Sequence, residues 1–308
     1  MTVKKNPVVC ADGRAGFSAV LPKEICFGKI LQVLLKCLLF AVVIGFLTFF
    51  VHYISDRFIF HVHGRPGKEK ILLMTYAAFD KFLMAAAFYL LGRKIPVKNS
   101  VLKAFVFTGL NWISNYIPQV MGLAFADGAI AEKAFSVSIM VCDSFVYMLA
   151  GIVLGLIFYE QTDATPCIPC SAMSFFKAAA VSAFVFPAFV AVFDFSMQFA
   201  YPDFSSIAVI QVSEHLASVF CINFYSWFFV TGIFFTVFYR FTEFNSHGSF
   251  VYFSLIYGLF LWTPVVMFMV LFGTAFLPTL VYSLAFLGII LAVSFLNSRI
   301  LCDLPEKK

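Results

Sequence analysis

The amino-acid sequence predicts an all-α integral membrane protein, a polytopic helical bundle with about eight transmembrane helices. Hydrophobic residues make up 62% of the 308 residues and charged residues 12%, whereas soluble domains contain about 45–50% apolar and about 25% charged residues. The hydrophobic residues form long continuous runs without the period-2 alternation of barrel strands. In a helix, about 20 apolar residues cross a hydrocarbon core about 30 Å thick. The runs therefore indicate membrane-spanning helices.

Runs of about this length follow one another along the chain. In order they cover residues 30–54, 71–91, 101–125, 134–158, 174–200, 209–239, 249–272 and 277–296. The sixth run would form a helix about 46 Å long at about 1.5 Å per residue. It is therefore either one tilted helix or a short interfacial segment followed by a span that begins near Leu216. Seven or nine spans are compatible with the same sequence.

The basic residues predict that both termini lie in the cytoplasm. We divide the chain into a polar leader (1–27), a single transmembrane domain (28–300) and a short tail (301–308). The first apolar run begins too late and is too long for a cleavable signal peptide. With the leader inside, the inner segments hold 14 Lys and Arg residues and the outer loops 5, although the first outer loop is itself basic. The positive-inside rule thus favours both termini in the cytoplasm. We expect a multi-pass protein of the cell membrane or an inner membrane.

Several classes of function are disfavoured by the same sequence. The basic residues are dispersed between the spans, so no basic face is available for nucleic acid. No polar stretch is long enough to bury a core of its own. The sequence has no G-x-S-x-G, H-E-x-x-H, Walker loop or histidine-box series. We therefore predict no cofactor and no metal site, and an enzyme is less favoured than a non-enzyme.

An internal duplication of two four-helix halves is compatible with three sets of short matches. The matched segments are Asp80-Lys81 with Glu214-His215, Gly109-Leu110 with Gly258-Leu259, and Tyr147–Ala150 with Tyr282–Ala285. Two halves of four spans would share one orientation in the membrane. Short matches also arise by chance in segments rich in Phe, Leu and Ala, and the three offsets are unequal. The sequence leaves both explanations open.

Ionisable residues lie at mid-depth in two of the predicted spans, Asp80 and Lys81 in the second and Asp143 in the fourth. A charge at the centre of a membrane helix costs about 2.5–3.5 kcal/mol on insertion scales. Consecutive helical residues project about 100° apart, so we expect that Asp80 and Lys81 cannot pair with each other. Each then needs a partner on another helix, or one of the two is neutral. One interpretation is a path for an ion, a proton or a polar substrate. The other is a structural Lys81–Asp143 pair that fixes helix packing.

The third span carries an amide stripe. Asn111, Asn115 and Gln119 are spaced by four and share one helix face, and Pro118 lies among them. Proline removes a backbone donor and leaves the Ser114 carbonyl without its usual bond. Transporters build midplane binding sites from such interrupted helices, although amides also join helices without any substrate. We favour a functional stripe.

The loop after the fourth span contains Cys167-Ile-Pro-Cys170. A C-x-x-C pair can cycle between dithiol and disulfide or supply two ligands of a zinc site. The pair resembles the C-x-x-C of membrane thiol oxidases, such as the quinone-coupled disulfide-forming proteins and the vitamin K epoxide reductases, over these four residues alone. No second pair is placed to exchange with it, so a structural or incidental role is the alternative.

The leading functional prediction is a permease or transporter subunit that moves a small polar or ionic solute. Its path would be lined by Asp80, Lys81, Asn111, Asn115, Gln119 and Asp143. The expected partners are the lipid bilayer, the solute and other membrane subunits. The alternatives are an enzyme that acts on lipid or thiols at the membrane face through Cys167 and Cys170, and an assembly or scaffold subunit.

Overall fold

The computed structural model describes residues 27–59, 67–125, 130–161, 172–200 and 276–302, together with positions 251, 255, 256 and 263. Its regular elements in these ranges are helices, and no strand occurs there. The long helices are α1 (Phe27–Ile54), α2 (Gly67–Leu91), α3 (Ser100–Phe125), α4 (Ile130–Ile157), α5 (Ala172–Ala200) and α9 (Phe276–Cys302). The short elements are a π-helical turn, η2 (Ser55–Ile59), and a 3-10 turn, η3 (Gly92–Lys94). The described part of the chain is therefore all-helical, as the sequence predicts.

Each of the six long helices begins and ends close to one of the apolar runs. Four segments of them are long and apolar enough to cross a membrane, namely Gly28–Ile54, Met74–Leu91, Met140–Ile157 and Phe276–Ile300. The sixth run and most of the seventh lie outside the described residues, as do the leader and the last six residues. The total of about eight spans, their orientation and the internal duplication remain predictions.

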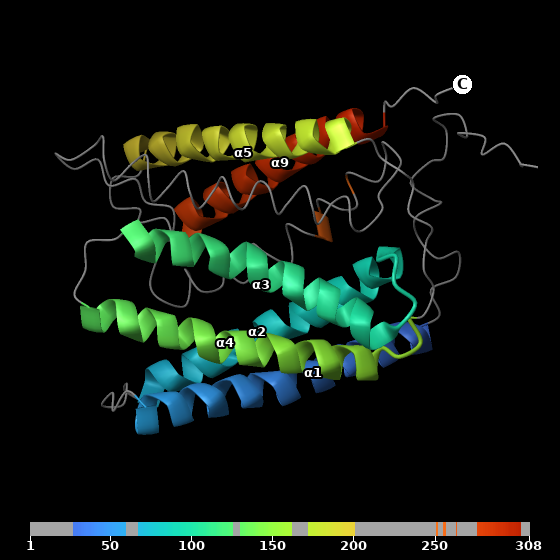
Figure 1. Ribbon diagram of the computed structural model, residues 1–308, viewed down its shortest axis with the longest axis vertical. Coiled ribbons are helices and arrows are strands. Elements are labelled where there is room, and N and C mark those ends of the chain that lie inside the picture. Colours follow the sequence, from blue (N-terminus) through green and yellow to red (C-terminus); the bar gives the residue numbers. More distant parts are fainter. Residues whose placement is uncertain are drawn as a thin grey trace, which may run out of the picture.

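Helices α1 to α4 pack into one bundle, and α5 packs against α9 (Figure 1). Within the bundle, α1 contacts both α2 and α4, and α3 contacts α4. A core of aromatic rings joins α2, α3 and the end of α4. The ring centroid of Phe88 lies 5.4 Å from that of Phe107 and 5.9 Å from that of Phe158, both edge-on. This geometry is the favoured one for aromatic pairs.

The outer faces of the helices are as apolar as the buried ones. On α1, Phe40 and Ile44 are fully buried, whereas Leu38, Val42 and Phe46 are exposed. A soluble helix would place charged or polar residues on its outer face. Exposed leucine and phenylalanine side chains of this kind are suited to lipid chains, so the surface of α1 supports a membrane environment.

Two glycines allow α3 and α4 to approach closely. Gly151 and Gly155 are one turn apart on α4, in a small-xxx-small arrangement that favours close helix contact in membranes. A Cβ atom on Gly151 would lie 2.9 Å from Oγ1 of Thr108, and one on Gly155 would lie 2.9 Å from the backbone nitrogen of Val101. Both positions therefore require glycine for the observed packing of α3 on α4.

Helix α3 begins at a polar cap and continues through its proline. The side-chain oxygen of Asn99 accepts a hydrogen bond of 2.9 Å from the backbone N–H of Leu102, which satisfies one of the first amides of the helix. The helix then runs without a break to Phe125, so Pro118 does not interrupt it. The structure therefore does not have the interrupted helix that the sequence predicts at Pro118.

Candidate functional site

Lys81 of α2 is a buried lysine with a carboxylate next to it in the sequence. Its Nζ atom donates a hydrogen bond of 2.6 Å to Oδ2 of Asp80. The expectation that these neighbours cannot pair was therefore wrong. The four methylene groups of lysine are flexible enough to bend the ammonium back to the preceding residue. A charge that is removed from water is stabilised by such pairing.

Asp143 of α4 pairs with His52 of α1. The distance between Nε2 of His52 and Oδ1 of Asp143 is 2.9 Å, and the two side chains are 28% and 19% exposed. The predicted direct pair between Lys81 and Asp143 is absent from the described contacts, although their charges still interact at longer range. His52 was not predicted as the partner of Asp143, because it lies near the end of the first apolar run.

Tyr147 of α4 connects the ion pairs to α3. The Nζ atom of Lys81 lies 4.7 Å from the centroid of the Tyr147 ring, within cation–π range. The hydroxyl of Tyr147 accepts a long hydrogen bond of 3.4 Å from Nδ2 of Asn111, which is buried. Tyr76 of α2 lies one helical turn before Asp80, on the same side of the helix.

We call this set the polar cluster. It comprises His52, Tyr76, Asp80, Lys81, Asn111, Asp143 and Tyr147. Every helix of the bundle contributes to it: α1 and α3 one residue each, α4 two, and α2 three. Four of the six residues predicted to line a path are therefore neighbours in space, and the other three members were not predicted to belong to it.

The side chains of the remaining predicted residues lie outside the described part of the structure. Asn115 and Gln119 lie one and two turns beyond Asn111 on α3, and their side chains are outside the described part of the structure. Cys167 and Cys170 lie in a segment that is also outside it. Within the described residues, no group of three or more His, Cys, Asp or Glu side chains is placed to hold a metal ion.

The formal charges within the polar cluster do not cancel when His52 is neutral. Lys81 carries one positive charge, and Asp80 and Asp143 carry one negative charge each, so these groups sum to one negative charge. Among the described residues, the polar cluster therefore brings together two carboxylates, one ammonium and one imidazole. Groups of these types can bind a proton or a small cation.

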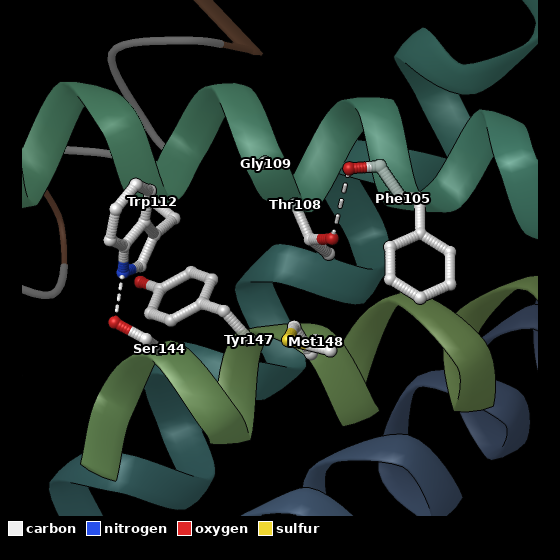
Figure 2. Close-up of a pocket in the computed structure, with 7 residues that line it drawn as sticks. All are labelled: Phe105, Thr108, Gly109, Trp112, Ser144, Tyr147 and Met148. Atoms are coloured by element: carbon white, nitrogen blue, oxygen red, sulfur yellow. Dashed lines mark hydrogen bonds between the residues drawn. The ribbon is translucent and has the colours of Figure 1, made fainter. Parts of the chain in front are cut away.

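A cavity of about 220 Å³ lies between α3 and α4 beside the polar cluster (Figure 2). Its walls are mainly apolar, and it is lined by Phe105, Thr108, Gly109, Trp112, Ser144, Tyr147 and Met148. Figure 2 shows Nε1 of Trp112 donating a hydrogen bond of 2.9 Å to Oγ of Ser144 across the cavity. Tyr147 is the residue that the cavity and the polar cluster share.

The polar atoms of the cavity wall are satisfied by the protein itself. The hydroxyl of Thr108 donates to the backbone carbonyl of Ala104 at 3.0 Å, and that of Ser144 donates to the carbonyl of Met140 at 2.6 Å. No ionisable side chain of the polar cluster except Tyr147 lines this cavity. Of the residues predicted to line a path, Asp80, Lys81, Asn111 and Asp143 do not line this apolar cavity.

The helices described here are those of a helical membrane protein in length and composition. Comparisons with protein-family models, with curated proteins and with solved structures give no match. The polar cluster and the surface of the bundle are accordingly the basis for a functional proposal.

Proposed function

We propose that the chain is a multi-pass membrane transport protein, a permease or transporter subunit that moves a small polar or ionic solute. In this proposal residues 28–300 form one domain of about eight spans, and residues 1–27 and 301–308 are cytoplasmic. The observation that carries it is the polar cluster, in which side chains from α1, α2, α3 and α4 meet inside the bundle. Ionisable residues at this depth usually mark ion pathways or proton relays.

The charge of the polar cluster supports a coupled mechanism. His52 pairs with Asp143, so an imidazole and a carboxylate join α1 to α4. The described members of the cluster include two carboxylates and one ammonium. Binding of a proton or a monovalent cation next to Asp143 would neutralise it and change the contacts between α1 and α4. Such a change is the kind of event that couples ion movement to solute movement.

The amides of α3 supply the polar surface for the solute in this proposal. Asn111 is the member of the polar cluster that lies on α3, and it donates a hydrogen bond to Tyr147. Asn115 and Gln119 follow at intervals of one helical turn, so the stripe extends along α3 from the cluster. Side-chain amides both donate and accept hydrogen bonds, which suits a small polar solute.

The test uses the purified protein in proteoliposomes on a solid-supported membrane. Transient currents are recorded as a panel of amino acids, sugars and inorganic ions is applied. We expect one class of solute to evoke a current in the wild type, and Asn111→Leu to reduce it at least about tenfold. The matched control is Thr75→Val, because Thr75 is exposed on α2 and bonds to its own backbone. Equal currents in wild type and Asn111→Leu, or no current with any solute, would contradict the proposal.

A further inference from the structure

A second, polar cavity lies at the end of the bundle where α1 begins and where α2 and α4 end. Its volume is about 180 Å³. The polar side chains around it are Lys29, Gln32, Lys36, Tyr89, Arg93 and Glu160. None of these residues belongs to the polar cluster.

The sequence brings these side chains together through the antiparallel order of the helices. Lys29, Gln32 and Lys36 are spaced by three and four on α1, so they lie on one face of its first turns. Arg93 lies in η3, directly after α2, and Glu160 lies three residues after the end of α4. Because α2 and α4 run opposite to α1, their last residues lie beside its first ones.

The charge of this cavity is strongly positive. Three cationic side chains, Lys29, Lys36 and Arg93, line it together with one carboxylate, that of Glu160. Glu160 forms an ion pair with Lys36. The formal charges of the described lining residues therefore sum to +2, and a ligand that binds there with favourable electrostatics carries negative charge.

Aromatic rings hold two of the cationic side chains in position. The guanidinium carbon of Arg93 lies 5.8 Å from the centroid of the Tyr89 ring. The Nζ atom of Lys36 lies 5.5 Å from the ring centroid of Phe158 and 5.8 Å from that of Tyr159. Cations that are already ordered lose less side-chain freedom when a ligand binds. The cavity is therefore better organised for an anion than a set of isolated surface lysines.

We propose that this cavity binds a phosphate group. The guanidinium of arginine matches two phosphate oxygens, and lysine provides point charges beside it. The amide of Gln32 adds a donor for a further oxygen. A charge of +2 equals that of a phosphate monoester dianion in magnitude. Basic pockets between transmembrane helices bind anionic lipid headgroups in this way.

The surroundings of the cavity suit a lipid as the source of the phosphate. Ile30, Leu31 and Leu34 follow Lys29 on α1 and are exposed, and so is Tyr159 beside Glu160. Acyl chains attached to a phosphate in the cavity would contact this apolar surface. A soluble phosphate compound would bind to the same cationic groups but would make no contact with this apolar surface. The site is independent of the transport proposal, because it shares no residue with the polar cluster.

The experiment measures binding to the full-length protein in detergent. The lipid arm titrates dioleoyl phosphatidic acid, with dioleoyl phosphatidylcholine as the uncharged reference, and counts bound lipids by native mass spectrometry. The soluble arm titrates inorganic phosphate by isothermal calorimetry. The variants are Lys29→Gln and Arg93→Gln. The control is Lys98→Gln, because Lys98 is exposed at the same end of the bundle but does not line the cavity.

We expect phosphatidic acid to bind more tightly than phosphatidylcholine, and each of the two variants to weaken it about tenfold or more while Lys98→Gln leaves it unchanged. Inorganic phosphate that binds with the same dependence on Lys29 would instead identify a soluble phosphate as the source. Lys29 is exposed, so its substitution does not threaten folding. The proposal is overturned if neither ligand binds, or if Lys29→Gln and Lys98→Gln have equal effects.

Discussion

The ammonium nitrogen of Lys81 lies 2.6 Å from a carboxylate oxygen of Asp80, the residue that precedes it in α2. The pair lies against the ring of Tyr147 on α4, and Lys81 is buried. Charges at this depth are costly unless they are paired. The pair thus explains how α2 keeps two adjacent ionisable residues in the middle of an apolar segment.

Removal of either charge alone should destabilise the protein more than removal of both. Lys81→Met or Asp80→Asn leaves one charge without its partner, and breaking a buried pair costs about 3–5 kcal/mol. The double variant contains no uncompensated charge and should lose much less than the sum of the two single losses. The free energy of unfolding in mixed detergent micelles, followed by circular dichroism, gives the comparison. Additive losses in the double variant would mean that the pair does not form.

Substitution of Tyr147 should separate the role of its hydroxyl from that of its ring. Tyr147→Phe removes the 3.4 Å hydrogen bond from Asn111 but keeps the ring next to Lys81. Interhelical hydrogen bonds in membranes are worth about 0.6 kcal/mol on average. Tyr147→Leu also removes the cation–π contact, worth about 2 kcal/mol where it is desolvated. In the same unfolding assay, Tyr147→Leu should therefore lose more free energy of unfolding than Tyr147→Phe. Equal losses in the two variants would contradict the contact between Tyr147 and Lys81.

A methyl group at Gly155 should disturb the contact between α3 and α4. The added Cβ would lie 3.0 Å from the carbonyl oxygen of Ser100 and closer still to the backbone of Val101. Overpacking of this kind costs about 1–3 kcal/mol. Gly288→Ala in α9 is the matched control, since a Cβ there meets no atom within 4 Å. The melting temperature should fall for Gly155→Ala alone, and a fall of the same size for both variants would reject the close contact.

The helices were predictable because each depends on a local property, the length of an apolar run. The partners of the polar cluster depend on how each helix is rotated about its axis. That rotation is hard to infer where the buried face and the lipid face are equally apolar, as with Phe40 and Phe46 on α1. His52 and Asp143 are 91 positions apart and meet through such rotations.

Asp80, Lys81, Asn111 and Asp143 could nevertheless be singled out from the sequence, because polar side chains are rare within apolar runs. The contacts that these side chains make could not be predicted from the sequence. The Lys81–Asp80 bond depends on the rotamer of a flexible side chain. The basic cavity at Lys29 and Arg93 was also missed, because its residues were counted as separate loop charges. The antiparallel packing of α1 with α2 and α4 brings these basic residues together.

The most direct test of the transport proposal is the current evoked by a pH jump in proteoliposomes. Asp143 is one of the two carboxylates among the described members of the polar cluster and pairs with His52, and Asp143→Asn removes its charge. We expect the wild type to give a proton current and Asp143→Asn to lose it, while Thr75→Val behaves as the wild type. A current of wild-type size in Asp143→Asn, or no current in the wild type, would contradict proton exchange at the polar cluster.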